Sequence, residues 1–478
     1  MKVNTDTLSI FEDDRPKVSV SENIQYLSQY INYDKIPIIG NKDFERITND
    51  IGVQQFRKDL SQFIFEVRPP YPTQKITKQS VAKCFHTLRD INTNIYCTPK
   101  ENIDKPVVEK HEDYTYPFDE YGQGIINAPA TYNDISNYYH QLLRLSTPSK
   151  RGEGVANIWT QGTAHDIWRC IKACWGGINR MKEIEVDGKK IRVGGELSED
   201  SYRSTFRLGH FIATQFKPNV AKTVYTMTKA KTVLDTSCGW GDRLAGFYTS
   251  KAESYTGCDP NPETFKNYIK QVIDYESFLG NFKPDITIKE DYFSCNGVKQ
   301  VKIYRCGAEN LPWHDIKNID CVFTSPPYFS TEHYNKGGLH EEDQSWFKFD
   351  TSDKWLNDFF LPVSENSFNS LSDNGHLLLN IIDPTIKGKR YKVCDVLVDT
   401  LYKYFNGTMG MTMSQRPDSR TDEQRENSKT KLNKKLGLFD RQKQLKSHYI
   451  ENIWCFSKNK YDYFSLYKEE KDIQKDLF

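Results

Sequence analysis

The segment 320–329 reads Asp-Cys-Val-Phe-Thr-Ser-Pro-Pro-Tyr-Phe and carries the side chains best suited to chemistry. Pro326 and Pro327 fix the backbone and remove two N–H donors, so this turn presents acceptors without competing donors. The Ser325 hydroxyl and the Pro326 carbonyl are the two acceptors, and Tyr328 adds an aromatic face. Two acceptors on the protons of an aryl amine favour a pyramidal nitrogen that can attack an electrophilic methyl group. The turn therefore predicts methyl transfer to an exocyclic amine.

The Tyr328 ring offers a face on which an extruded nucleic-acid base can stack, and Phe329 can extend it. A base inside a duplex cannot reach such a turn, so a duplex substrate implies base flipping. A Pro-Pro pair is common in surface loops. Ser-Pro-Pro-Tyr at the end of a strand is a far more specific pattern.

Residues 233–242, Val-Leu-Asp-Thr-Ser-Cys-Gly-Trp-Gly-Asp, place a strand, an acidic residue and two glycines directly before a helix. Gly239 and Gly241 let the backbone approach a ligand closely, and the Asp235 carboxylate can hold a cation. This pairing suits a ligand with an amino-acid moiety, whereas Gly246 leaves open a dinucleotide-type turn. Alone, the motif fits a purely structural turn equally well.

The next strand ends in Gly257-Cys-Asp259, and its carboxylate comes about 20 residues after the glycine turn, where sheets of this type hold ribose hydroxyls. A cap for the following helix is the alternative interpretation of Asp259. The loop after the third strand contains Glu309 and Trp313, either of which could contact an adenine. An ordinary surface loop is equally compatible with these two residues.

From about residue 220, short apolar runs alternate with helical stretches, which is typical of βαβ units and a largely parallel sheet. A helix is expected over Asp242–Ser250, and Asn261 with Pro262 can begin another. Strands are expected at Thr232–Asp235, Ser254–Cys258, Val301–Arg305, Ile319–Thr324, His376–Ile382, Thr408–Thr412 and His448–Ser457, the last two as an antiparallel pair.

The pattern changes near residue 200, where we place the main domain boundary. Residues 1–200 are expected to form a mixed α/β or mostly helical domain whose role the motifs do not assign, with substrate recognition as a candidate. Residues 201–460 are expected to form the catalytic domain and residues 461–478 a charged tail.

Within the catalytic domain, Met413–His448 holds ten Lys or Arg against five Asp or Glu. This composition suits a target-recognition insertion that contacts phosphates, or a solvated loop. The segment Thr331–Asp350 is a candidate flap over the base.

Composition restricts the partners and the compartment. The 65 Lys and Arg against 64 Asp and Glu give a net charge of +1, so any nucleic-acid surface must be local. We expect a soluble, cytoplasmic or nucleoid-associated protein with no membrane partner, because no run approaches the roughly 18 apolar residues of a span and no signal peptide is evident. We expect no metal site and interpret Cys170 and Cys174, with His165 nearby, as a helix face.

These motifs resemble those of the S-adenosylmethionine-dependent DNA amino-methyltransferases, which methylate adenine N6 or cytosine N4. That family has a Rossmann-like seven-strand sheet and a signature of Asp, Asn or Ser followed by Pro-Pro and an aromatic residue. The form Thr324-Ser-Pro-Pro-Tyr328 is closer to the cytosine-N4 members. The resemblance covers roughly residues 205–460 and implies S-adenosylmethionine as cofactor and DNA as partner.

The resemblance also implies roles for individual residues. Asp235–Gly241, including Cys238, matches the cofactor turn, and Asp259 matches the ribose-binding acid. Phe216-Lys-Pro218 matches the segment that closes over the methionine part, which makes Phe216 and Pro218 candidate cofactor contacts. Gly307 stands where the family often has an acid, so adenine recognition would rest on Glu309 or on neither.

The order of the motifs differs from that of many serine-type members, which leaves cytosine and adenine both open. An RNA base amino-methyltransferase and a catalytically silent DNA-recognition subunit are the alternatives. The RNA enzymes usually carry Asp or Asn before Pro-Pro, and an intact Ser325–Tyr328 turn disfavours a silent subunit. A nicotinamide dehydrogenase is disfavoured by the same turn.

Overall fold

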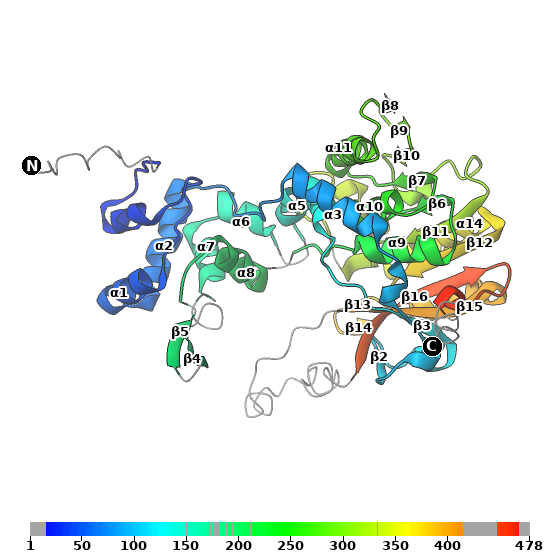
Figure 1. The fold of residues 1–478 in the computed structure, drawn as a ribbon, viewed down its shortest axis with the longest axis horizontal. Coiled ribbons are helices and arrows are strands. Elements are labelled where there is room, and N and C mark those ends of the chain that lie inside the picture. The colour runs from blue at the N-terminus through cyan, green and yellow to red at the C-terminus, as the bar shows by residue number, and fades with distance from the viewer. Residues whose placement is uncertain are drawn as a thin grey trace, which may run out of the picture. The chain divides into compact units, whose positions relative to one another are not determined.

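The chain forms two compact units in the computed structural model, Met1–Lys75 with Gln141–Thr214, and Ile76–His140 with Gln215–Phe478 (Figure 1). The structure describes residues 16–149, 152–172, 174, 182–186, 189–193, 195–210, 212–331, 333–413 and 447–467. Nearly all of the expected recognition insertion at 413–448 and the last part of the expected tail, from residue 468, lie outside these ranges.

The first unit is mostly helical around a core that includes the fully buried Trp159. Gly52, at φ +79°, separates its first two α-helices. The elements are η1 (Glu22–Tyr30), α1 (Asn41–Ile51), α2 (Val53–Val67), α6 (Val155–Gln161), α7 (Ala164–Ile171), α8 (Glu199–Gly209) and the antiparallel pair β4 (Lys182–Val186) and β5 (Lys189–Val193).

The second unit is built on one twelve-stranded sheet. In spatial order its strands are β1 (Cys97–Pro99), β3 (Gly122–Ile126), β15 (Phe405–Thr412), β16 (His448–Ser457), β12 (Leu371–Asn380), β11 (Ile319–Thr324), β6 (Thr232–Asp235), β7 (Ser254–Cys258), β10 (Gln300–Tyr304), β9 (Tyr292–Asn296) and β8 (Asp285–Ile288), while β2 (Val107–Glu109) pairs with β16. The strands from β12 to β10 are parallel, and β16 lies antiparallel to β12 and β15. The seven strands from β15 to β10 confirm the expected Rossmann-like α/β sheet.

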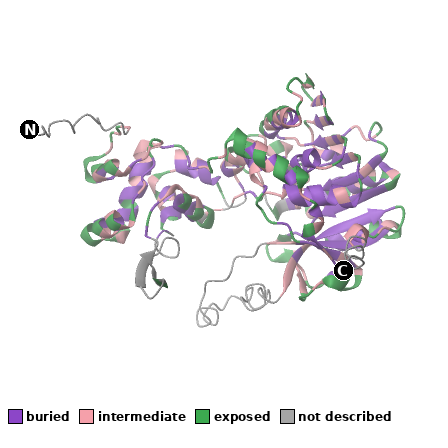
Figure 2. Ribbon diagram, in the orientation of Figure 1, coloured by how far each residue is buried: buried purple, intermediate pink, exposed green. Residues whose placement is uncertain are grey.

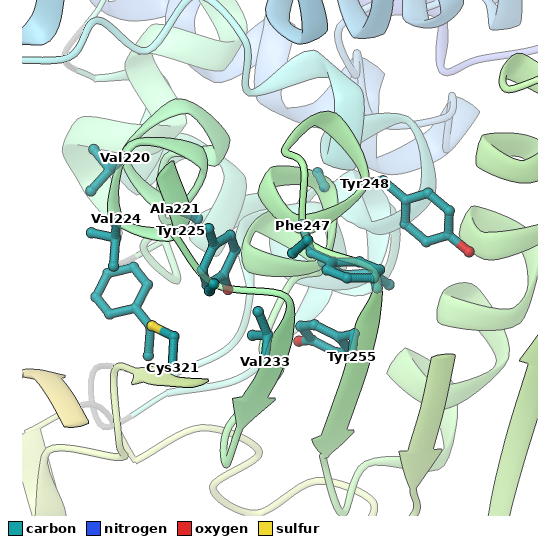
Figure 3. Close-up of a cluster of buried hydrophobic side chains, with 14 of the residues drawn as sticks. Val220, Ala221, Val224, Tyr225, Val233, Phe247, Tyr248, Tyr255 and Cys321 are labelled. Carbon is teal, nitrogen blue, oxygen red and sulfur yellow. The ribbon is translucent and has the colours of Figure 1, made fainter. Parts of the chain in front are cut away.

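Helices cover both faces of this sheet, and the burial pattern in Figure 2 follows the same layers. The first face is covered by α3 (Lys78–Asp90), α9 (Pro218–Met227), α10 (Asp242–Thr249) and α11 (Pro262–Phe278), and the second by η7 (Trp355–Phe360), α14 (Leu361–Asn369) and α15 (Val393–Thr400). Alternate residues of a strand point to opposite faces, so Val233 joins the first core and Leu234 the second. Figure 3 shows Val233 and Tyr255 in the first core with Tyr225 and Phe247.

The strand order reverses at β6. The next strands along the chain, β7 and β10, extend to one side of it, and β11 and β12 extend to the other. Open α/β sheets bind ligands in the crevice outside the carboxyl ends of the strands at such a reversal. Both sequence motifs lie there, because the glycine turn follows β6 and Ser325 follows β11.

Two expectations about organisation differ from the structure. Residues 76–140, placed in the N-terminal domain by sequence, belong to the second unit because β1 and β3 extend its sheet, and strands of three residues leave no readable periodicity. The segment from residue 461 begins as core, with Tyr463 and Phe464 each only 1% exposed. Among the described residues, none of the helices is both long and apolar enough for a bilayer crossing.

Candidate active site

Asp235 at the end of β6 is completely buried and is fully engaged by the chain's own groups. Its Oδ2 accepts from Arg243 Nε at 2.9 Å and from the Tyr255 hydroxyl at 2.7 Å, and its Oδ1 accepts from the Ser237 N–H at 3.1 Å. The cation held by Asp235 is therefore Arg243, which also donates to the Ser237 carbonyl. This corrects the expectation that Asp235 holds a ligand cation: its carboxylate fixes the shape of the turn.

Asp235→Ala is expected to destabilise the protein by about 3–5 kcal/mol, because it leaves the buried Arg243 charge uncompensated. Urea unfolding followed by circular dichroism measures this loss. Asp350→Ala, which removes an exposed carboxylate paired with Lys354, is the matched control and is expected to cost less than about 1 kcal/mol. Equal losses in the two variants would contradict the structural role of Asp235.

The glycine turn after β6 leaves open space beside Gly239. Gly239 has φ +58°, and a Cβ placed there would meet no atom closer than the Ser237 carbonyl oxygen at 3.7 Å. Gly241, at φ +72°, has no such space, because a Cβ would collide with the Gln271 side chain. Gly246 lies within α10, where a Cβ would come within 2.7 Å of the Pro218 carbonyl of α9. Gly246 therefore allows two helices to pack, and only Gly239 borders space for a ligand.

Asp259 follows β7 and lies beside this turn. Its Oδ2 accepts from the Gly239 N–H at 3.1 Å and from the Tyr268 hydroxyl at 3.0 Å. Its Oδ1 accepts from the Asn261 N–H at 3.0 Å and from the Thr264 hydroxyl at 2.8 Å. A carboxylate has about four lone-pair sites, so four protein donors occupy all of them.

Two of these four donors have a second acceptor within reach. The Thr264 hydroxyl also lies 2.8 Å from the Asn261 carbonyl oxygen, and the Tyr268 hydroxyl also donates to the Gly239 carbonyl. The Thr264 and Tyr268 hydroxyls can therefore turn from Asp259 to these two carbonyls and still donate a hydrogen bond each. Asp259 can thus receive two hydroxyl donors from a ligand, one on each oxygen, which fits a ribose diol.

Of the other expected cofactor residues on this side, Cys238 and Pro218 are buried and Phe216 is partly buried. Cys238 is 1% exposed with its thiol 3.4 Å from the Tyr255 hydroxyl, so only its backbone belongs to the turn surface. Phe216 packs edge-on against Phe323 of β11, and the Arg243 guanidinium lies 5.3 Å from the Phe216 ring centroid. Phe216 thereby links the residues around β6 to β11. Buried Pro218 begins α9 and packs toward α10.

Glu309 lies in the short helix η4 (Ala308–Asn310) and pairs with Lys348 Nζ at 3.0 Å. Lys348 belongs to α12 (Ser345–Lys348), inside the expected flap. The flap also reaches the glycine turn, where the Tyr334 ring meets Trp240 edge-on at 6.2 Å. Trp313 donates its indole N–H to the Ala308 carbonyl at 3.1 Å. Glu309 and Trp313 therefore both have protein partners, and the flap lies against two of the loops at this edge of the sheet.

The catalytic turn holds Ser325 in a defined hydrogen-bond chain. The Ser325 hydroxyl donates a hydrogen bond of 3.1 Å to the Tyr328 hydroxyl. The Tyr328 hydroxyl in turn donates a hydrogen bond of 2.9 Å to the carbonyl of Asn380, the last residue of β12. This direction of donation leaves the lone pairs of Ser325 Oγ as acceptors. The Pro326 carbonyl accepts no hydrogen bond within the described ranges. Two acceptors with no proton to offer a substrate amine thus stand at one turn.

The backbone after this turn is strained. Phe329 has φ +47°, a region that bulky side chains rarely occupy, and His333 and Asn335 follow at +43° and +59°. Such conformations cost about 1–3 kcal/mol each and cluster at functional sites. Phe329 is 6% exposed and packs on Trp355, so it supports the turn from below and does not extend the Tyr328 face.

A small cavity joins the two motifs. Thr236 and Ser237 of the glycine turn line it together with Thr324 and Pro326 of the catalytic turn, and α14 closes it. The register of β6 against β11, in which Leu234 is the partner of Val322, explains why the two turns lie at the same level. The cofactor candidates and the catalytic candidates therefore share one edge of the sheet.

The cysteines interpreted as a helix face have protein partners. Cys170 and Cys174 are fully buried, and Cys174 Sγ lies 3.0 Å from the Thr205 hydroxyl, while the His165 ring stacks on Trp168. Burial raises the pKa of the Cys170 thiol to about 12, which keeps it protonated.

Sequence reasoning missed the partners that organise the site, namely Arg243, Tyr255, Thr264, Tyr268 and Asn380. A signal existed for two of them. Thr264 and Tyr268 are four residues apart on the helix that follows Asp259, and residues at this spacing share a helix face. A hydroxyl stripe on that face would have indicated donors to Asp259.

No protein-family model matches this sequence, and the search of curated proteins found no match. Solved structures with similar folds include Trm1 from Pyrococcus horikoshii with S-adenosyl-L-methionine (14% identity, 34% of this chain and 37% of that one, TM-score 0.24). An rRNA methylase from Streptococcus thermophilus (13%, 44% and 93%, 0.21) and TrmN from Thermus thermophilus (11%, 64% and 69%, 0.20) are also similar. The chain thus spans little more than a third of the Trm1 structure's length. At TM-scores this low, no property of these proteins transfers to this chain.

Proposed function

We propose that this protein transfers a methyl group from S-adenosylmethionine to an exocyclic amino group of a flipped DNA base, cytosine N4 or adenine N6. The observation that carries the proposal is the direction of the hydrogen bond from Ser325 to Tyr328. It gives the turn two acceptors, Ser325 Oγ and the Pro326 carbonyl, and an aryl amine has two protons to donate.

The residues beside Gly239 fit the proposed cofactor. Asp259 would hold the ribose hydroxyls through the two lone-pair sites that Thr264 and Tyr268 can vacate. Gly239 would face the cofactor, because nothing occupies the space that a side chain would fill there. When bound, S-adenosylmethionine supplies the sulfonium methyl group, the electrophile of the reaction.

The catalytic turn acts on the amine. Hydrogen bonds from the two amine protons to Ser325 and Pro326 draw the nitrogen lone pair out of the ring, so the nitrogen can form its bond to the methyl carbon. The carbon–sulfur bond breaks and its electron pair stays on sulfur. The alkylated nitrogen is then positively charged, and its surplus proton leaves to water. Tyr328 supports the base with its ring and keeps the Ser325 proton turned away from the amine.

The experiment that tests the proposal offers the purified protein cofactor with a labelled methyl group, together with separate DNA and RNA pools. Digestion to nucleosides and mass spectrometry then identify the product. We expect label in N4-methylcytosine or N6-methyladenine from DNA. Label in RNA alone would replace DNA by the RNA alternative, and label in neither pool would favour the silent-subunit alternative.

Cofactor affinity is expected to fall as the pH drops through about 6. Burial raises the pKa of Asp259 to about 6, and the protonated carboxyl is a poorer acceptor for ribose hydroxyls. The effect on stability has the opposite sign: a raised native pKa favours the fold at low pH, and that contribution is lost as the pH rises through 6.

Titration calorimetry between about pH 5 and pH 8 measures this dependence. Asp259→Asn should abolish it. Asp383→Asn should retain it, although burial raises the pKa of Asp383 to about 6 as well. A pH dependence that follows Asp383 and not Asp259 would contradict the placement of the ribose.

A further inference from the structure

A small basic hairpin follows β12 next to the catalytic turn. It consists of β13 (Thr385–Ile386) and β14 (Lys389–Arg390), paired antiparallel and joined by Lys387-Gly388. The segment Thr385–Lys392 holds four Lys or Arg and no Asp or Glu. Lys387, Lys389 and Lys392 are all exposed. The hairpin segment therefore carries a local positive charge, although the whole chain has a net charge of only +1.

The base of the hairpin is firmly fixed. Arg390 Nε donates to Oδ2 of the buried Asp383 at 2.8 Å, and Oδ1 of Asp383 accepts from the Cys394 N–H at 2.9 Å. The Tyr391 N–H donates to the Pro384 carbonyl at 3.0 Å, which closes the other side. These hydrogen bonds therefore fix the position of the hairpin tip relative to the sheet.

The hairpin lies beside the residues proposed to do the chemistry. β13 runs next to η5 (Phe329–Thr331), the turn that directly follows Tyr328. Ile386 and Tyr391 pack, together with Tyr328, against the second core of the sheet. Lys387 follows Ile386 in the sequence, and Lys389 is the cross-strand partner of Ile386, so their charges stand close to the turn that would receive a base.

The tip keeps a lysine at a conformational cost. Lys387 has φ +49° and Gly388 has φ +80°, the left-handed pair of a type I′ turn, which favours Asn-Gly. A side chain other than Gly, Asn or Asp costs roughly 1–2 kcal/mol there. Asparagine would make the same turn more stable but without a charge.

The charges of the hairpin divide into two groups. Arg390 is paired with Asp383 and Asp113, and Lys392 lies 3.5 Å from Asp395. Within the described part of the chain, Lys387 and Lys389 form no ion pair, and Lys389 Nζ lies 5.0 Å from the Tyr391 ring centroid. Two unneutralised cations therefore remain at the tip.

We infer that Lys387 and Lys389 form a clamp for the phosphate backbone of the DNA strand whose base enters the catalytic turn. The inference rests on the proposed function. Two cations on a fixed hairpin beside the catalytic turn would bind the phosphates on either side of a flipped nucleotide. Such contacts position the strand without reading its sequence.

The test compares the wild type with the double variant Lys387→Asn, Lys389→Gln, in which asparagine suits the left-handed turn. Fluorescence anisotropy with labelled duplex DNA of mixed sequence gives the affinity between about 50 and about 200 mM salt. We expect weaker binding by the double variant and a slope of log affinity against log salt that is smaller by about 2, since each phosphate contact contributes about 0.9. Affinity for the cofactor should stay near the wild-type value.

The control variant, Lys270→Gln with Lys283→Gln, removes two exposed lysines, one from α11 and one just before the edge strand β8. It should keep the wild-type slope. If the hairpin variant also keeps the wild-type slope and affinity while the wild type methylates DNA, the clamp is wrong and the proposed function stands. If the wild type neither methylates DNA nor binds it in a salt-dependent way, both are overturned.

Discussion

Ser325→Ala is expected to slow methyl transfer by about two orders of magnitude or more and to leave cofactor binding near normal. The Ser325 hydroxyl donates its hydrogen bond to Tyr328, so the Ser325 oxygen can act toward the substrate amine only as an acceptor. The hydrogen bond from the amine to Ser325 strengthens as positive charge develops on the nitrogen. Its loss therefore slows the reaction and does not weaken ground-state binding. Single-turnover kinetics with labelled cofactor and DNA measure the rate, and calorimetry measures cofactor binding.

Two further variants separate this role from a general effect of losing a hydroxyl. Tyr328→Phe keeps the stacking ring but removes the group that orients Ser325, so we expect a smaller loss of about tenfold, or ~1.4 kcal/mol. Ser277→Ala removes a hydroxyl that donates to the Asp274 carbonyl of its own helix at 2.7 Å, and it should keep the wild-type rate. A Ser325→Ala enzyme with the wild-type rate would exclude the serine as an acceptor in the reaction.

The sheet was largely predictable from the sequence. The bounds of β6, β7, β11 and β16 match the expected strands residue for residue, because turn or polar residues mark both ends of each strand. The cap of α11 was predictable for a similar reason: Asn261 accepts from the Glu263 N–H, with Pro262 in the first turn. Residues that are neighbours in the sequence determine these strand bounds and this helix cap.

Features that depend on distant partners were not predictable. β1 and β2 have three residues each, and they become strands only because they pair with β3 and β16. The segment beginning at Tyr461 looks like a solvated tail by composition, yet Tyr463 is buried against the sheet. Three or four residues carry no periodicity of their own, so only the tertiary structure assigns them.

The candidate site shows the same limit in its side chains. The sequence indicates which residues gather at the carboxyl edge of the sheet, since β6, β7 and β11 are parallel neighbours there. It does not indicate which partner each carboxylate takes. Asp235 takes Arg243 and Glu309 takes Lys348, while Asp259 alone keeps lone pairs that its donors can vacate. Of the three acids expected at the cofactor, Asp235 is committed to the turn and Asp259 can receive ligand hydroxyls, while a contact of Glu309 with the adenine stays a prediction.

That distinction sets the expectation for Asp259→Ala, which should weaken cofactor binding by about a hundredfold. Two hydrogen bonds from ribose hydroxyls to a carboxylate contribute about 1.5 kcal/mol or more each, and 1.4 kcal/mol is a factor of ten in affinity. Titration calorimetry measures the change. Glu263→Ala removes a nearby carboxylate that forms an ion pair with Lys266 at 2.6 Å, and it should bind cofactor as the wild type does.

Asp259→Ala also leaves the Gly239 and Asn261 N–H groups without their acceptor, so part of its effect could come from a loosened turn. The double variant Thr264→Val, Tyr268→Phe separates the two explanations. It removes the two donors that a ribose must displace and keeps the Asp259 bonds to both backbone N–H groups. If the ribose takes these vacated sites, the double variant binds cofactor more tightly than the wild type. Weaker binding would mean that the two hydroxyls themselves hold the cofactor, and that Asp259 serves the turn alone.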